Sequence, residues 1–251
     1  MVSKKEKPNK TKIPLNNQNS VSILQQKEGT KAMGKFNIET ISDQPLYPVA
    51  EAARYIRLNP NTLRYWLKVL ELKTPHPKFL SFNNLIEAYV IKALQQEHNI
   101  RLNAVKQAIQ YASKKLNIPR ILLHRELKFT GGDLFIEFYG DLINLSRSGQ
   151  LGIKGVLEQY LERIDWENNL PIRLYPYIMD IQKYIALDPK IRFGRPIIKS
   201  KGIETAIIRE RIDAGEDEAF IANDYDISIK EVSIALAYEM ALETLKRKRA
   251  A

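Results

Sequence analysis

The hydrophobic positions after residue 46 repeat with the period of an amphipathic helix. Two sets share the spacing i, i+3, i+4, i+7, and they are Val49, Ala52, Ala53 and Ile56, then Leu63, Trp66, Leu67 and Leu70. This spacing places apolar side chains on one face of a helix. Pro60 separates the two sets, and proline disfavours helical backbone in the residue before it. The pattern therefore predicts two short helices joined by a tight turn, the helix-turn-helix unit.

Two longer helices are predicted next. Asn84 and Glu87, three residues apart, resemble a capping pair that opens a helix running to about Glu97. A second helix is indicated by an apolar stripe that ends before Pro119, formed by Leu102, Val105, Ile109, Ala112 and Leu116. The stripe is compatible with core packing or with a dimer seam, and the shortness of the repeat favours the core.

The pattern changes to strands in the middle of the chain. Residues 127–138 read as a hairpin around a Gly-Gly pair that supplies the positive φ angles of a tight turn. Residues 141–153 read as a second, looser hairpin, 154–163 as a helix and 172–175 as a short strand. No arrangement of side chains required for catalysis is apparent here.

The C-terminal part returns to helices. After turn-rich segments at 187–189 and 193–196, a helix is predicted over 204–214, closed by Gly215 in a left-handed conformation. A short helix over 217–223 follows. Ser228 and Glu231 form a capping box for a last helix, whose predicted apolar face consists of Ile229, Val232, Leu236 and Met240. Three such helices predict a trihelical, helix-turn-helix-like bundle.

These elements predict an α+β, mostly helical fold with four parts. Residues 1–45 are rich in Lys, Asn, Gln and Ser and are expected to be a disordered basic tail. Residues 46–125 form the helix-turn-helix domain and 126–184 a region containing β-hairpins. Residues 185–251 form the trihelical domain with a basic tail.

Charge is distributed unevenly among these parts. The net charge of +10 divides into +4 for residues 1–45, +9 for 46–125, +1 for 126–203 and −4 for 204–251. A basic domain favours an anionic partner, most commonly DNA or RNA, although a solvated surface that aids solubility is the alternative. From Glu204 to Glu239 there are ten acidic and three basic residues, a poor match for a phosphate backbone.

The second helix of the basic module carries the candidate DNA-binding residues. With its apolar residues turned inward, donor-rich side chains must face outward, on the helix that such proteins place in the major groove. With two lysines that follow the helix, the predicted set is Asn61, Thr62, Arg64, Tyr65, Lys68, Lys73 and Lys78. The alternative is a helical bundle whose exposed face is polar for solubility, and the basic bias and tight turn favour DNA.

Several classes of protein are disfavoured. The chain has no cysteine, which excludes disulfides and thiolate sites. It lacks a glycine-rich phosphate loop, a two-histidine metal spacing and a nucleophile signature, so neither an enzyme nor a cofactor or metal site is expected. No apolar run approaches about 18 residues and the N-terminus lacks a signal-peptide pattern, so a cytoplasmic protein without a membrane partner is expected.

The C-terminal motifs resemble the small domain of VapB-type antitoxins that pair with PIN-like, VapC-type toxins. The resemblance rests on short matches spread over the C-terminal part, which are Asp188-Pro189, Phe193-Gly194-Arg195-Pro196, Gly202-Ile203-Glu204-Thr205, Ala214-Gly215-Glu216, Ile221-Ala222, Asp224-Tyr225 and Ala237-Tyr238-Glu239. Leu80-Ser81-Phe82, Leu85–Ala88, Ser148-Gly149-Gln150 and Arg173–Pro176 extend it to the longer members of that group. Thr62–Trp66 resembles a MerR-type winged helix, although the glycine-tyrosine-arginine stretch of the MerR wing is missing.

The resemblance implies an antitoxin that neutralises a PIN-like RNase toxin and represses its own operon by binding promoter DNA, as a homodimer on a two-fold symmetric operator. A toxin of this family has a carboxylate-lined metal site, which cations favour. The candidate toxin contacts are Arg195, Lys246, Arg247, Lys248 and Arg249. The alternative for Arg195 is that it is a turn residue that holds adjacent loops together. The alternative for the other four is a solvated helix end, where positive charges interact favourably with the C-terminal end of the helix dipole. A stand-alone MerR-like regulator without a toxin, and a protein–protein adaptor, remain as rival functions.

Overall fold

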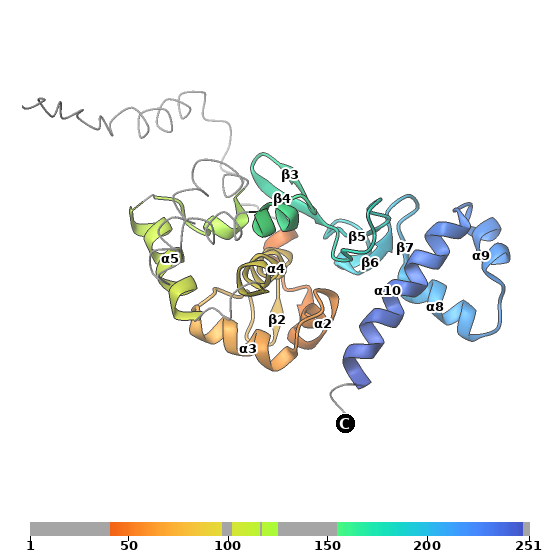
Figure 1. Cartoon of the computed structure of the whole chain (residues 1–251), viewed down its shortest axis with the longest axis horizontal. Helices are drawn as coiled ribbons and strands as arrows, with labels where there is room; N and C mark the ends of the chain where they lie inside the picture. The colour runs from red at the N-terminus through yellow and green to blue at the C-terminus, as the bar shows by residue number, and fades with distance from the viewer. Residues whose placement is uncertain (1–40, 97–101, 116, 125–154, 248–251) are drawn as a thin grey trace, which may run out of the picture. The chain divides into compact units, whose positions relative to one another are not determined.

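The computed structural model describes residues 41–96, 102–115, 117–124 and 155–247, which belong to one compact unit, Glu39–Ala251. These residues form an α+β, mostly helical structure (Figure 1). The two predicted hairpins, over 127–138 and 141–153, and residues 1–40 of the predicted tail lie outside them. Among the described helices, none combines the length and apolar character needed to cross a membrane.

The two helices predicted around Pro60 are present. Helix α2 spans Val49–Tyr55 and α3 spans Pro60–Val69. Asn59 begins α3 because its side chain accepts a hydrogen bond from the amide of Asn61 at 2.8 Å, and Pro60 suits the first helical position. Strands β1 (Tyr47–Pro48) and β2 (Phe79–Leu80) pair antiparallel on either side of these helices in the sequence.

Helix α4 (Phe82–Gln96) is surrounded by the rest of the fold. Every residue from Leu80 to Ile91 is buried, so this helix has no solvent face over most of its length. It contacts β2, β4 (Leu170–Leu174), α5 (Leu102–Lys115) and the short 3-10 helices η1 (Ile41–Asp43) and η2 (Ile121–Leu123). Figure 1 shows α4 end-on. The buried residues of α5 agree with the core interpretation of its apolar stripe.

The predicted capping pair of α4 was wrong. The cap is formed by Ser81 and Asn84: the Asn84 amide donates to the Ser81 hydroxyl at 3.1 Å, and the Ser81 amide donates to the Asn84 side chain at 3.2 Å. The helix therefore begins at Phe82. Glu87 is engaged elsewhere, because it accepts from the Asn84 side-chain amide and from Arg120.

A five-stranded antiparallel sheet in the order β3-β4-β5-β6-β7 follows a helix over residues 155–161. Its strands are Ile164–Glu167, Leu170–Leu174, Ile185–Leu187, Pro196–Ile198 and Ile203–Glu204. The sequence predicted one strand here, at 172–175, which corresponds to β4. The sheet continues across the predicted domain boundary at residues 184 and 185, where Leu174 of β4 pairs with Leu187 of β5.

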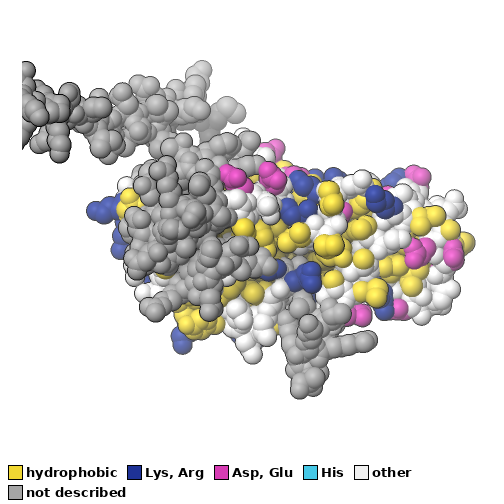
Figure 2. Space-filling model, in the orientation of Figure 1, with side chains coloured by type: hydrophobic (Ala, Val, Ile, Leu, Met, Phe, Trp, Pro, Cys, Tyr) yellow, Lys and Arg dark blue, Asp and Glu magenta, His cyan; other side chains and the backbone are white. Residues whose placement is uncertain are grey.

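Helices α8 (Thr205–Asp213), α9 (Glu218–Tyr225) and α10 (Ile229–Arg247) complete the chain. Gly215 follows α8 with a φ of 93°, as predicted. The Ser228–Glu231 capping box is confirmed, since the Ser228 amide donates to Glu231 at 2.8 Å and the Glu231 amide donates to the Ser228 hydroxyl at 3.2 Å. Figure 2 shows acidic side chains around α9.

The apolar face predicted for α10 was partly wrong. Ile229 and Met240 are exposed by 54% and 56%, whereas the buried stripe contains Val232, Ala235, Tyr238 and Leu242. The buried stripe is rotated about the helix axis relative to the predicted face, because α10 packs against α8, α9 and α2 at once. The Tyr238 hydroxyl donates to the carbonyl of Tyr55 in α2 at 3.4 Å.

A second tyrosine joins β1 to the loop between β5 and β6. The buried Tyr47 hydroxyl donates to the carbonyl of Gly194 at 3.1 Å. Gly194 has a φ of 72°, and a Cβ at this position would lie 1.9 Å from the Tyr47 hydroxyl oxygen. Both the backbone conformation and the close approach therefore require glycine.

We expect Gly194→Ala to destabilise the protein by about 2–5 kcal/mol, from left-handed strain of roughly 1–2 kcal/mol and overlap with Tyr47 of roughly 1–3 kcal/mol. Gly215→Ala is the matched control, because its φ is 93° but a Cβ would have nothing within 4 Å. Urea denaturation of both variants isolates the cost of the overlap. Equal losses would contradict the proposed steric role of Tyr47.

Candidate nucleic-acid interface

Helix α3 presents a polar, exposed face, as predicted. Leu63 and Trp66 are buried, whereas Asn61, Arg64, Tyr65 and Lys68 are exposed and Thr62 is half-buried. The Asn61 side-chain oxygen accepts a hydrogen bond from the Arg64 guanidinium at 2.9 Å. Arg64 is thus oriented by a neighbour one helical turn away, and both residues keep free donors toward solvent.

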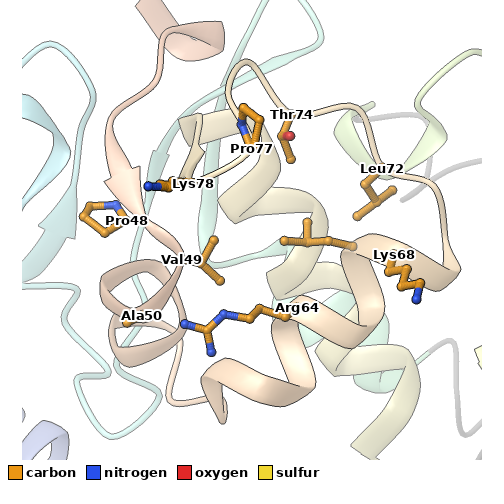
Figure 3. Close-up of a pocket in the computed structure, with 10 residues that line it drawn as sticks. Pro48, Val49, Ala50, Arg64, Lys68, Leu72, Thr74, Pro77 and Lys78 are labelled. Carbon is orange, nitrogen blue, oxygen red and sulfur yellow. The ribbon is translucent and has the colours of Figure 1, made fainter.

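A groove of about 580 Å³ lies beside this helix (Figure 3). Three of the predicted residues, Arg64, Lys68 and Lys78, line it, together with Pro48, Val49, Ala50, Leu67, Leu72, Thr74 and Pro77. Arg64 extends from α3 toward Ala50 of α2. The lining holds three cations and no carboxylate, so the groove is suited to an anionic ligand such as a phosphate.

Lys73 and Lys78 lie on the segment that joins α3 to β2, and both are exposed. Lys73 does not line the groove; its carbonyl accepts from the Asn84 side chain at 2.8 Å. Lys78 lies in a tight turn, in which the Phe79 amide donates to the His76 carbonyl at 3.2 Å. The His76 and Phe79 rings are in edge contact. The turn is short, and Lys78 is the cationic side chain that it places in the groove beside α3.

Lys92 of α4 fixes the turn between α2 and α3. Its ammonium donates to the carbonyl of Ile56 at 2.9 Å. Burial, with a contribution from the nearby charge of Arg57, lowers the pKa of Lys92 to about 8. The side chain was not predicted as functional, and it positions α3 without being part of its exposed face.

A partly buried ion-pair network, in which only Glu87 is fully buried, stabilises the same module. Arg120 donates to Glu87 at 3.0 and 3.1 Å and to Asp43 at 3.0 Å. Burial alone would lower the pKa of Arg120, but its hydrogen bonds to Glu87 and Asp43 raise it above the usual value. All three groups are satisfied by one another, so we assign the network a structural role. Sequence reasoning missed it because the partners are 33 and 77 residues apart.

The candidate toxin contacts are not brought together with this groove. Arg195 is exposed and pairs with Glu204 at 3.4 Å, beside a smaller pocket of about 210 Å³. Lys246 and Arg247 belong to α10, but their side chains lie outside the described residues, as do Lys248 and Arg249 entirely. In the part of the chain that is described, no three His, Asp or Glu side chains cluster as metal ligands.

Comparison with known proteins matches a C-terminal segment to one family and most of the chain to a named protein. Residues 185–238, from β5 into α10, match a family described as "Protein of unknown function (DUF433)". The chain is 27% identical over 237 residues to the Mycobacterium tuberculosis protein named "Putative antitoxin VapB45", and the match covers 81% of this chain and 97% of that protein.

A solved structure has a similar fold. The crystal structure of Rv2018 from Mycobacterium tuberculosis gives a TM-score of 0.66 at 23% identity, over 77% of this chain and 98% of that one. The match covers most of this chain, so the likeness in fold is not confined to the C-terminal segment.

We expect the stability contributed by Lys92 to depend on pH. Its folded-state pKa of about 8 lies below the usual 10.5, so the unfolded chain binds more protons between these values. Stability therefore rises with pH in that window. Raising the pH from 7 to 9.5 should stabilise the wild type relative to Lys92→Met by about 1–2 kcal/mol in urea denaturation. A difference that does not change with pH would contradict the lowered pKa.

Proposed function

We propose that this chain is the antitoxin of a type II toxin–antitoxin pair, which binds and neutralises a PIN-like RNase toxin and represses its own operon by binding promoter DNA. The observation that carries the proposal is the basic groove beside α3, in a chain that is similar along most of its length to a protein named as an antitoxin.

The DNA-binding half of the proposal rests on α3. In this interpretation the helix enters the major groove, with Arg64 at the base edges and Asn61 holding its guanidinium. Lys68 and Lys78 contact phosphates on either side, with Lys73 nearby. Two copies bind as a homodimer, because operators with two-fold symmetry are read by symmetric dimers.

The toxin-binding half is supported by the C-terminal part of the chain. The acidic bundle repels a phosphate backbone, so its exposed surface is better suited to a protein than to DNA. Arg195 and the cations at the end of α10 are the proposed contacts to an acidic toxin surface. The chain acts by binding and carries out no catalysis.

A stand-alone MerR-like regulator without a toxin is the second candidate. It is favoured by the completeness of the α3 groove, which is lined by residues 48–78 alone. The two candidates make the same prediction for DNA and opposite predictions for the neighbouring gene product.

We expect Arg64→Ala to weaken binding to the chain's own upstream DNA by about 1–3 kcal/mol and to relax sequence preference, as measured by fluorescence anisotropy. Lys230→Ala, which removes an exposed cation from α10, is the control and should leave affinity unchanged. Lys78→Ala should weaken binding to all sequences and reduce the salt slope by about one. If the wild-type affinity for this DNA does not exceed that for random DNA, the repressor function is wrong.

Co-expression with the protein encoded by the adjacent gene tests the toxin partnership. We expect the two proteins to co-purify and the chain to abolish an RNase activity of its partner, measured on a labelled RNA. A chain that binds its operator but captures no neighbouring protein would instead support the stand-alone regulator.

A further inference from the structure

Three consecutive residues between β5 and β6 have left-handed backbone conformations. Their φ angles are 48° for Arg192, 54° for Phe193 and 72° for Gly194. This region is unfavourable for a bulky residue such as phenylalanine. The Phe193 side chain is nonetheless 78% exposed, so little packing offsets the strain. Strained residues that are not explained by packing are found at binding sites.

The surrounding loop holds this turn in one shape. Buried Asp188 accepts from the Lys190 amide at 2.9 Å and from the Arg173 guanidinium at 2.7 Å. The Gly194 amide donates to the Ile191 carbonyl at 3.0 Å, and the Gly194 carbonyl accepts from the Tyr47 hydroxyl. The exposed ring is therefore presented by a preorganised scaffold, which reduces the entropic cost of binding.

The charges beside Phe193 indicate what it meets. From Ile185 to Ile203 the chain has five cationic residues and one acidic residue, Asp188, whose charge is already paired with Arg173. Lys190, Arg192 and Arg195 are exposed, and of these Arg195 also pairs with Glu204, the residue after this segment, at 3.4 Å. An exposed aromatic ring between arginines has the composition of a protein–protein hot spot, complementary to an apolar pocket with an acidic rim.

We propose that the turn Arg192–Gly194 is the anchor by which this chain docks its protein partner: Phe193 enters an apolar pocket, and Arg192 and Arg195 pair with carboxylates at the rim. The inference rests on the proposed function, because the partner is the toxin encoded beside this chain. It adds an apolar anchor and the strained turn to the toxin-binding surface.

Two other occupants fit less well. An extended nucleic acid would continue from this turn onto the acidic bundle that begins at Glu204, and one ring does not provide the successive stacking platforms that single strands use. A second copy with this turn on the two-fold axis would bring the same cationic turn against itself. A folded partner with acidic groups around one pocket meets neither difficulty.

The test compares Phe193→Asn with the control Ile181→Ala, which removes another exposed apolar side chain, 86% accessible, from the segment between β4 and β5. The probe is the co-expressed neighbouring protein, with its Kd measured by calorimetry. We expect Phe193→Asn to raise the Kd at least about tenfold, with Ile181→Ala within about twofold of wild type. Because asparagine tolerates left-handed backbone, the melting temperature of Phe193→Asn should stay the same or rise. Arg192→Ala should slow association and reduce its salt dependence.

The outcomes separate this inference from the proposed function. If the wild-type chain binds the neighbouring protein and Phe193→Asn binds it equally well, the anchor is wrong while the antitoxin function stands. If the wild type does not bind, both fail. A lower melting temperature for Phe193→Asn would make Phe193 a structural residue and overturn the anchor. The anchor is also overturned if Phe193→Asn leaves the affinity for the protein unchanged but alters the oligomeric mass of the chain without its partner, or its affinity for single-stranded RNA.

Discussion

The burial of helix α4 is the constraint on which the rest of the structure depends. A helix without a solvent face must be covered on every side, and the elements that cover it come from both halves of the described chain. Strand β2 and η1 precede it in the sequence, η2 and β4 follow it, and all four contact it. Helices α2 and α3 are therefore fixed to a core that they do not form alone, and the hydrogen bond from Lys92 of α4 to Ile56 ties the turn between them to that core.

This arrangement separates two surfaces of different chemistry. The groove beside α3 is lined by cations, of which Arg64 is held by a local hydrogen bond to Asn61. The turn at Phe193 is held by Asp188 within its own loop and by a long-range contact to Tyr47, and it combines positive charge with an exposed ring. Binding to a phosphate backbone requires mainly positive charge on long side chains, whereas binding in a protein pocket requires an apolar side chain held in a fixed position. The groove beside α3 has the first property, and the turn at Phe193 has the second.

The α-helices could be predicted from the sequence, because they carry a regular apolar spacing, as α2 does, or a clear start or stop signal, such as Ser228 with Glu231 before α10 and Gly215 after α8. The strands of the sheet could not, since β5, β6 and β7 are two or three residues long and show no alternation. The face of α10 was partly wrong because three neighbouring elements, and not its own pattern, select the buried stripe. The exposed face of α3 could be predicted, because it lies opposite the buried residues of the helix. The Arg120 network could not, because its partners are far away in the sequence. The turn around Phe193 was recognised, while its left-handed backbone was not, because phenylalanine rarely adopts that conformation.

The hydrogen bond from Tyr47 to Gly194 has a consequence for how the parts of this chain can be separated. It joins the first strand of the basic module to a loop almost 150 positions later, and Tyr238 joins α10 to α2 in the same way. Cutting the chain between residues 184 and 185 would leave both tyrosines facing water and would unpair β4 from β5. Neither fragment would retain the surface that it has in the whole protein. Activities of this chain are therefore separable by single substitutions on its surface and not by dissection into pieces.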